Sequence, residues 1–252
     1  MRPDAADRAM RSDHVAIIPH VEALFPVFIV AFIAIVIAGV VFGHIAEKKR
    51  QEELQKWARE RRLSFTRDKD YSFDHYYSHF GCLRNGSNRY AYNILRGRLR
   101  ERSFVAFDYH YQTTSTDSKG RTQTHHHHFS AAIVDSEIPL KELIIRPETF
   151  GDKLAGFFGW DDIDFESAEF SRRFYVKAPD RKWAYDVIHQ RTMEFLLGQP
   201  KVSIEFDRAC VIAWDGGRWG PARYEHAISV VEGILDRLPL YVVQQQKEMG
   251  GK

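Results

Sequence analysis

The sequence predicts an α+β fold, in which an N-terminal transmembrane helix precedes a cytoplasmic domain with an antiparallel β-sheet and two main amphipathic helices. A run of 24 residues without Asp, Glu, Lys or Arg spans residues 23–46, which is long enough to cross a hydrocarbon core of ~30 Å. Residues 64–135 place aromatic and β-branched residues between Asn, Gly and Ser breaks, a pattern typical of strands. Residues 146–252 have the order strand–strand–helix twice, which differs from the alternation of a doubly wound sheet.

The charges on either side of the apolar run predict its orientation. Residues 1–22 carry three Arg against four acidic residues, whereas residues 47–62 carry seven Lys or Arg against four Glu. Lys and Arg collect on the cytoplasmic flank of a membrane span. We therefore expect an extracytoplasmic tail at 1–22 and a cytoplasmic domain at 63–252, in a bacterial inner membrane. The net negative tail differs from the short basic region of a cleaved signal peptide, so we expect an uncleaved single-pass anchor.

Residues 47–62 are predicted to continue the helix as a basic juxtamembrane segment. The residues that share one side of this segment are Leu54, Trp57, Ala58 and Arg61. One interpretation is a solvated stalk with Glu–Lys pairs such as Glu52–Lys56, and the other is attraction to anionic lipid head groups. We expect the remainder, from about Ser64, to bury enough core to fold without the anchor.

Charge and cysteine content restrict the function classes. Residues 63–252 carry 26 basic and 26 acidic residues, whereas a nucleic-acid binder shows a basic surplus. No nucleic-acid partner is therefore expected. Cys82 and Cys210 are isolated from any Cys-x-x-Cys pattern, which fits the reducing cytoplasm.

Three successive strands are predicted in the first half of the domain, at residues 89–95, 103–112 and 122–134. Gly97 and the arginines around it are predicted to form the first connection. Residues 114–121 form the second connection, because Asp117 to Gly120 has turn-forming residue types. An antiparallel meander follows.

Shorter elements are predicted next: a strand at 143–146, a helix at 151–159, an alternating segment at 162–167 and a strand at 174–178. No linker rich in Pro, Gly or Ser separates 63–145 from 146–252, which favours one domain.

The clearest helix is predicted at 180–198, with Asp180 as its N-cap and Gly198 at its end. Two strands are predicted at 202–206 and 210–214, because their apolar residues alternate. A final helix is predicted to begin near Pro221 and to stop before Pro239.

The segment 164–198 resembles a family of uncharacterised bacterial single-pass membrane-anchored proteins with a domain of unknown function. Their common pattern is Phe-Glu-x-x-Glu-Phe, then Arg-x-Phe-x-Val, an Asp, an Ala, and a Met followed by Leu-Leu. The matching residues here are Phe165, Glu166, Glu169, Phe170, Arg173, Phe174, Val176, Asp180, Ala184, Met193, Leu196 and Leu197. Ser171 departs from the Asn that such proteins often carry. The resemblance implies a bacterial membrane-anchored protein and transfers no catalytic residue.

Four consecutive histidines begin the third predicted strand. If this strand pairs around the 114–121 loop so that opposed residue numbers add up to about 235, His110 faces His125 and Asp108 faces His127. Imidazoles and a carboxylate are a zinc ligand set, so we take these four residues as a candidate metal site and zinc as a candidate cofactor. The alternative is a polar cross-strand ladder in which Asp108 hydrogen-bonds a histidine.

Four alternating arginines form a candidate contact for an anionic partner: Arg96, Arg98, Arg100 and Arg102. They would contact lipid phosphates or an acidic protein, or else form a solvated basic loop. The sequence lacks the glycine-rich phosphate loops and the common hydrolase signatures, and no catalytic residue is predicted.

The function that these patterns favour is a non-enzymatic, membrane-tethered binding or scaffold module. Its predicted partners are the lipid bilayer, through residues 23–46, and a protein or anionic lipid head groups. One alternative is a metal-dependent hydrolase that uses the His/Asp face. The other is an envelope- or lipid-associated accessory protein.

Overall fold

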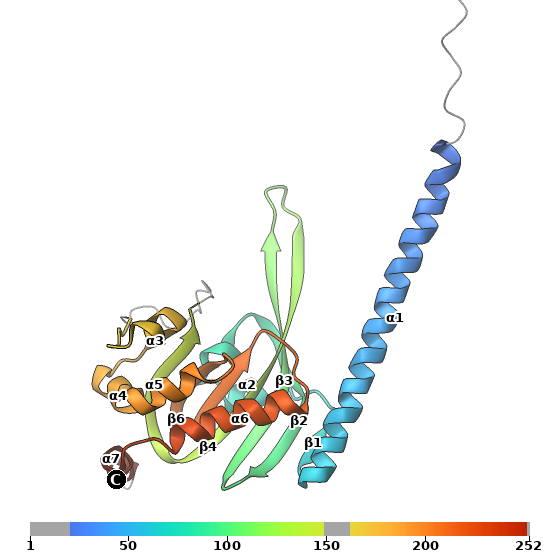
Figure 1. Ribbon diagram of the computed structural model, residues 1–252. Helices are drawn as coiled ribbons and strands as arrows, with labels where there is room; N and C mark the ends of the chain where they lie inside the picture. Colours follow the sequence, from blue (N-terminus) through green and yellow to red (C-terminus); the bar gives the residue numbers. More distant parts are fainter. Residues whose placement is uncertain (1–20, 149–161, 251–252) are drawn as a thin grey trace, which may run out of the picture. The chain divides into compact units, whose positions relative to one another are not determined.

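The computed structural model describes residues 21–148 and 162–250 of the 252-residue chain, and the predicted helix at 151–159 lies outside them. The elements (Figure 1) are α1 Val21–Arg61, β1 Ser64–Thr66, α2 Phe73–Tyr76, the 3₁₀ turn η1 Gly81–Arg84, β2 Ser87–Leu99, β3 Arg102–Thr116, β4 Thr122–Pro147, α3 Ala168–Arg173, β5 Phe174–Lys177, α4 Arg181–Val187, α5 Gln190–Leu197, β6 Ser203–Asp215, α6 Pro221–Leu235 and α7 Leu240–Gly250. Two compact units divide the chain after Arg50.

The first unit contains the apolar part of α1. From Phe28 onward this helix is long and apolar enough to cross a membrane, and none of its most apolar window is buried. Phe28, Phe32 and Phe42 are each more than two-thirds exposed. Large apolar side chains that stay outside a core mark a surface that another apolar phase covers. The predicted N-terminal apolar helix is confirmed.

The second unit begins at Gln51, so it includes the last turns of α1. Leu54, Trp57 and Ala58 are all buried in its main core. The predicted shared side is confirmed, but the solvated-stalk interpretation is wrong for these three residues, because their side chains pack inside the folded unit. The predicted start of the domain at residue 63 is therefore too late.

A six-stranded antiparallel sheet forms the centre of the second unit. Strands β1 to β4 follow one another in order, as the predicted meander requires. The long strand β4 pairs with β3 and then with β5 along one edge, and with β6 along the other. The strand predicted at 143–146 is the end of β4 rather than a separate element.

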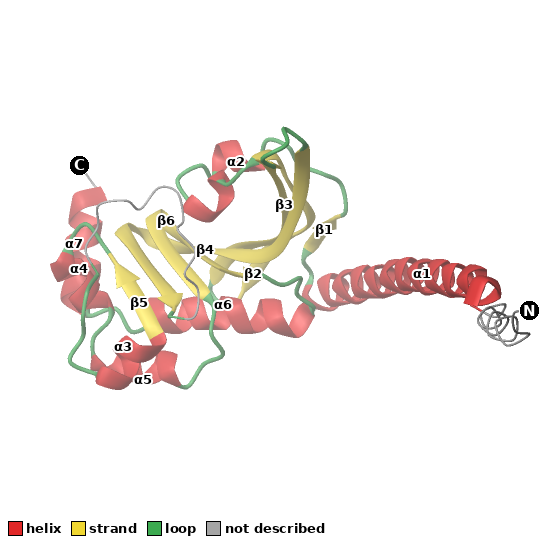
Figure 2. Cartoon of the chain, turned by 90° about the horizontal axis from the view of Figure 1, so that it is seen from above, coloured by secondary structure: helices red, strands yellow, loops and turns green. Residues whose placement is uncertain are grey.

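Helices cover the two faces of this sheet unequally (Figure 2). α6 lies on one face, together with the larger apolar cluster, to which α4, α5 and α7 also contribute. The opposite face has a smaller cluster, which includes Phe73, Phe80 and Leu83 from α2, η1 and the chain between them. This thin cover leaves part of the second face open, and the candidate site lies there.

Three predicted elements differ in detail. The helix predicted at 180–198 is two helices, α4 and α5, because the backbone turns at Ile188 and His189. Asp180 is the predicted N-cap and accepts a hydrogen bond from Trp183 N at 3.1 Å. The strands predicted at 202–206 and 210–214 form one strand, β6, which bends where Arg208 has a φ of 56°.

Two further segments also differ from the prediction, one before β5 and one after α6. The alternating segment 162–167 contributes an isolated bridge between Asp162 and Lys177. α7 follows Pro239 and was not predicted, because it has few apolar residues at helical spacing. Its buried side chains are Val242 and Gln246.

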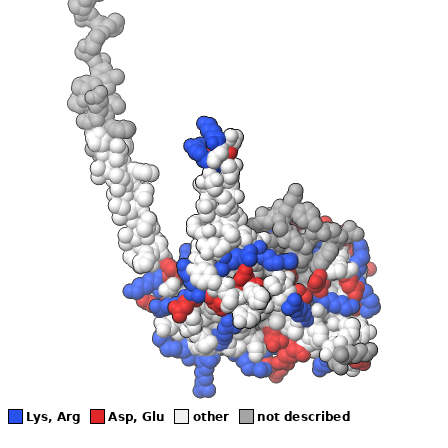
Figure 3. Space-filling model, turned by 180° about the vertical axis from the view of Figure 1, so that it is seen from behind, with Lys and Arg blue, Asp and Glu red and all other residues white. Residues whose placement is uncertain are grey.

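The outer part of the β3–β4 hairpin extends beyond the sheet. β2 reaches only Gln112 of β3, and β6 reaches only Ser130 of β4. The strands continue as a two-stranded ribbon to the pair Thr116 and Thr122. Its shaft is largely uncharged, and basic side chains gather at its tip (Figure 3).

Candidate functional site

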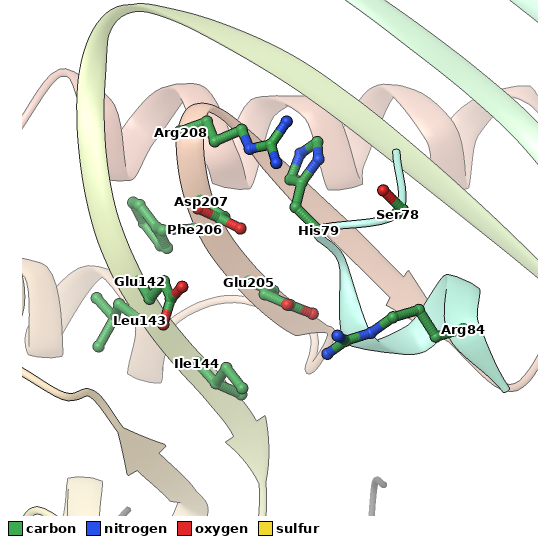
Figure 4. A pocket seen from close by; sticks show the side chains of 10 residues that line it. All are labelled: Ser78, His79, Arg84, Glu142, Leu143, Ile144, Glu205, Phe206, Asp207 and Arg208. Carbon is green, nitrogen blue, oxygen red and sulfur yellow. The ribbon is translucent and has the colours of Figure 1, made fainter. Parts of the chain in front are cut away.

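A polar pocket of about 440 Å³ opens on the thinly covered face of the sheet (Figure 4). Its walls come from β4, β6 and the segment between α2 and the end of η1. The residues that line it are Ser78, His79, Arg84, Glu142, Leu143, Ile144, Glu205, Phe206, Asp207 and Arg208.

The pairing of β4 with β6 places the acidic side chains of this pocket on one face. Ile144 is opposite Glu205, and Leu143 is opposite Phe206. Because side chains alternate along a strand, Phe206 enters the larger core while Glu205 and Asp207 face the other way. The register shifts between Leu140 and Leu143, next to the bend of β6.

Glu205 forms the floor of the pocket. Glu205 is only 3% exposed. Both of its carboxyl oxygens accept hydrogen bonds from Gly81 N, at 3.0 and 3.1 Å. Burial raises the pKa of Glu205 to about 8, although the Gly81 N–H and the Arg84 guanidinium oppose the shift. Glu205 is therefore mainly protonated at neutral pH.

His79 forms a wall of the pocket and packs against Phe80, with ring centroids 4.2 Å apart. Both ring nitrogens are buried, and neither has a hydrogen-bond partner within the described parts of the chain. Burial lowers the pKa of His79, and nearby Arg208 lowers it further while Asp207 opposes this. The neutral imidazole offers one donor and one acceptor to a bound group.

Charged side chains of both signs surround the floor. Arg208 lies beside His79 at one end of the view, and Arg84 lies at the other end, with Glu205 between them (Figure 4). Among the described residues, no ion pair joins Arg84 or Arg208 to Glu142, Asp207 or Glu205. The pocket thus presents guanidinium and carboxylate groups that remain available.

The structure corrects the register that the candidate metal site required. His110 pairs with His128, and Tyr111 pairs with His127. Opposed numbers therefore add up to more than predicted, and His125 and His127 lie on the opposite face from His110. Within residues 21–148 and 162–250, no group of three or more His, Cys, Asp or Glu side chains is arranged to hold a metal ion.

The histidines instead form two polar ladders. On one face, His110 Nε2 lies 3.1 Å from His126 Nδ1, and Tyr92 Oη lies 3.1 Å from His128 Nδ1. Burial lowers the pKa of His110 and of His128. These contacts form a polar cross-strand ladder, as the alternative to the metal site predicted. The same alternative also predicted a hydrogen bond between Asp108 and a histidine, whereas the partners of Asp108 are other residues.

On the other face, Thr113 Oγ1 contacts His127 Nε2 at 2.8 Å, and Ser115 Oγ contacts His125 Nε2 at 2.9 Å. Both histidines therefore have hydroxyl partners along the exposed ribbon. A zinc ion that bound His125 or His127 through Nε2 would have to break these hydrogen bonds.

Asp108 has its own partners within the larger core. It accepts hydrogen bonds from Asn93 Nδ2 at 2.8 Å, Ser130 Oγ at 2.6 Å and Tyr224 Oη at 3.1 Å. Ser130 Oγ also accepts from Trp219 N at 2.9 Å. Asp108 therefore ties β2, β4 and α6 together, and it is saturated by groups of this chain.

The four alternating arginines surround the β2–β3 turn. Strand β2 continues past Gly97 to Leu99, so the turn lies at Arg100 and Glu101 rather than at Gly97. A Cβ atom at Gly97 would lie 2.4 Å from Leu63 Cδ2, so this glycine permits close packing.

Three of these arginines contact acidic residues of the same chain. Arg98 lies 3.6 Å from Glu137, Arg100 lies 3.2 Å from Glu232, and Arg102 lies 2.6 Å from Asp236.

The fourth, Arg96, lies over the Phe73 ring at 5.9 Å. Contact of the four arginines with an anionic partner stays a prediction.

None of the site residues predicted from the sequence lines the pocket. Alternation in 202–206 places Glu205 on the face away from Ile204 and Phe206, where it is expected to be solvent-exposed. It is buried because η1 lies over it. In the sequence, the pocket is represented by a charged stretch in β6 and by the Ser-His-Phe-Gly segment at 78–81. These two segments are far apart in the chain, and nothing in either of them predicts that they contact each other.

No family model and no curated protein matches the sequence. The fold is similar to that in the crystal structure of the mycobacterial trehalose monomycolate transport factor A, TtfA, with a TM-score of 0.56 and 9% sequence identity. The match covers 74% of this chain and 93% of that chain. At this identity the likeness shows a shared fold and transfers no residue.

Proposed function

We propose that this chain is an envelope- and lipid-associated accessory protein, which uses α1 as a membrane anchor and its folded unit as a binding module. The observation that supports it is the fold shared with a trehalose monomycolate transport factor over 93% of that factor's chain. Trehalose monomycolate is by its name a glycolipid. A binding module that serves lipid transport combines the two non-enzymatic functions that the sequence favours.

The exposed apolar helix supports the membrane part of the proposal. The described residues bury none of its most apolar window, and hydrocarbon is the phase that would accept these side chains. The basic residues after the span favour a cytoplasmic position for the folded unit. The proposed location is therefore the bacterial inner membrane, with the N-terminus outside.

The pairing of β3 with β4 gives no support to the hydrolase alternative. This alternative required His110, His125, His127 and Asp108 on one face, and the pairing of β3 with β4 divides this set. Asp108 is also fully engaged by Asn93, Ser130 and Tyr224. No other observation favours hydrolysis.

Loss of the gene tests the functional proposal. Envelope lipids are pulse-labelled in cells with and without it, and the label is followed from the inner membrane to the outer layers. We expect labelled lipid to accumulate at the inner membrane in the absence of the protein, and the full chain to restore transport. An unchanged lipid distribution would rule the accessory function out.

A matched variant separates anchoring from folding. Ile33→Asp with Val36→Asp places two charges in the apolar run, each costing about 2.5–3.5 kcal/mol at the centre of a span. The double variant should leave the membrane fraction and fail to restore transport. Arg191→Gln, an exposed change outside the span, should restore it fully.

Topology has its own test. A reporter that works only in the cytoplasm, fused after Lys252, should be active, and a periplasm-only reporter at the same place should be silent. The reverse result would place the folded unit outside and contradict the proposed orientation.

A further inference from the structure

We propose that the pocket between η1, β4 and β6 binds a small zwitterionic group, which carries an ammonium at one end and an anion at the other. The inference goes beyond the envelope role and does not rest on it. Its basis is the lining of the pocket: two guanidinium groups, two rim carboxylates, a buried carboxyl group and an imidazole with no hydrogen-bond partner among the described residues.

The size and shape of the cavity suit a small molecule. Its volume of about 440 Å³ falls within the ~300–1,000 Å³ of typical ligand sites. It has a buried polar floor at Glu205 and an open rim that carries Arg84, Arg208 and Glu142. A ligand can therefore enter from solvent and reach a desolvated polar group.

The mixed charges argue for a ligand with two charges of opposite sign. A lone anion would bind near Arg84 or Arg208 but would face Glu142 and Asp207. A lone cation would meet the opposite problem. The ammonium of a zwitterion can lie against the carboxylates while its anion accepts hydrogen bonds from a guanidinium, which recognises carboxylate or phosphate oxygens in pairs.

The absence of internal ion pairs supports this assignment. Some other arginines of the folded unit contact carboxylates of the chain, as Arg89 contacts Asp74 at 2.6 Å and Arg223 contacts Asp215 at 2.8 Å. Among the described residues, the two arginines of the pocket have no such partner. His79 adds a donor and an acceptor that no described residue of the chain uses.

The state of Glu205 adds a proton to the binding reaction. Burial keeps this carboxyl mainly protonated at neutral pH, because its pKa is raised to about 8. An ammonium group beside it favours the carboxylate form. Binding at pH 7 should therefore release a proton from Glu205 to solvent, with no other covalent change.

The binding test uses the full chain in dodecyl maltoside at pH 7, with O-phosphoethanolamine as the probe in a calorimetric titration. Glycylglycine is the second probe, and ethanolamine and inorganic phosphate are the single-charge controls. We expect one of the two zwitterions to bind at least about tenfold more tightly than either control. Equal binding of a single-charge control, or no binding of either zwitterion, would overturn the proposal.

Variants locate the site. Arg208→Gln and Glu142→Gln remove charges of opposite sign from exposed residues of the pocket, and each should weaken binding by about tenfold or more. The matched controls are Arg191→Gln and Glu166→Gln, exposed changes outside the pocket, which should bind as the wild type does. If the pocket variants also bind as the wild type does, the site lies elsewhere and the proposal is wrong.

Two further arms characterise the ligand. Titrations in buffers of different ionisation enthalpy should show proton release that disappears in Glu205→Gln. In nanodiscs of phosphatidylglycerol, added phosphatidylethanolamine should weaken binding of the soluble probe if lipid head groups occupy the pocket. Unchanged binding would support a soluble zwitterion as the ligand. Both results are independent of the lipid-transport phenotype.

Discussion

Asp108 and Glu205 are two buried carboxyl groups of one sheet, and they lie on opposite faces with opposite surroundings. Asp108 accepts from Asn93, Ser130 and Tyr224. Among the residues that the structure describes, Glu205 accepts hydrogen bonds only from the backbone N–H of Gly81, and a cavity opens above it. Burial alone therefore does not identify a functional carboxyl group. What distinguishes the two is how much of their hydrogen-bonding capacity the chain itself uses.

The largest expected effect concerns the face that Asp108 holds together. Trp57, near the end of α1, stacks on Tyr224 at 6.4 Å, and Tyr224 donates to Asp108. A chain that starts at Ser64 lacks Trp57 and two other buried residues of α1. We now expect it to aggregate or to melt without cooperativity, whereas a chain that starts at Gln51 should melt cooperatively in calorimetry.

A cooperative transition in the Ser64 chain, at a temperature close to that of the Gln51 chain, would show that α1 is dispensable. Such a result would also support the predicted start of the folded domain at residue 63.

The next effect is the loss of Asp108. Asp108→Ala leaves the donors of Asn93, Ser130 and Tyr224 buried without an acceptor, and it should lower the free energy of unfolding by about 3–5 kcal/mol. Urea unfolding of the Gln51 chain measures it. A loss below about 1 kcal/mol would mean that these donors find other partners.

Replacing Glu205 by its amide should have the opposite sign. The pKa of Glu205 is raised from 4.5 to about 8 by folding, so the folded state binds the proton more tightly. Its contribution is fully present below about pH 4.5 and is lost as the pH rises towards 8. Glu205→Gln cannot ionise, so it should be more stable than the wild type at pH 9 by up to about 5 kcal/mol, since each pKa unit corresponds to ~1.4 kcal/mol.

Unfolding in urea at pH 5, 7 and 9 checks this sign. The advantage of Glu205→Gln should shrink towards pH 5, and Asp108→Asn is the matched amide substitution on the other face. If Glu205→Gln destabilises the protein equally at all three values, the carboxyl group is ionised in the fold and the contrast fails.

A smaller effect is expected for Tyr224→Phe. It removes one of the donors to Asp108 and keeps the ring that stacks on Trp57, so a loss of about 1–2 kcal/mol is expected. Thermal and urea unfolding should agree. A loss as large as that of Asp108→Ala would show that the Tyr224 hydroxyl alone accounts for the effect of Asp108 on stability.

The smallest effect is expected at the rim of the pocket. Arg208→Gln and Glu142→Gln remove exposed charges without an ion pair among the described residues, and the free energy of unfolding should stay within about 0.5 kcal/mol. A larger loss would mean that these charges serve the fold, which would remove the basis for a ligand there.

The parts of the fold that depend on local pattern could be predicted from the sequence. The apolar run, the meander of β2, β3 and β4, and the cap at Asp180 all follow from residues close together in the chain. The register of β3 with β4 could not, because the polar Thr, Ser and His residues there have no apolar alternation that fixes a face. The metal site assembled from His110, His125, His127 and Asp108 failed for this reason.

The pocket could not be predicted because it depends on contacts between distant segments. Glu205 is buried by Gly81, which lies far away in sequence, and the intervening pattern predicts only separate elements. The break between α4 and α5 was equally hidden, since no Pro or Gly occurs at Ile188 and His189. His189 Nε2 lies 2.9 Å from the carbonyl oxygen of Arg237, so a tertiary contact supports the turn.

The pairing of β4 with β6 has a consequence for how the protein is made. The β2–β3 and β3–β4 hairpins join neighbouring segments, so they can form while the chain is still being synthesised. β6 must wait until α3, β5, α4 and α5 have been added, and closing so long a loop is slow. Until then β4 has a bare hydrogen-bonding edge, which is a hazard for misassembly. The pocket can therefore form only after β6 has been synthesised and has paired with β4, so ligand binding would report that this long-range pairing is in place.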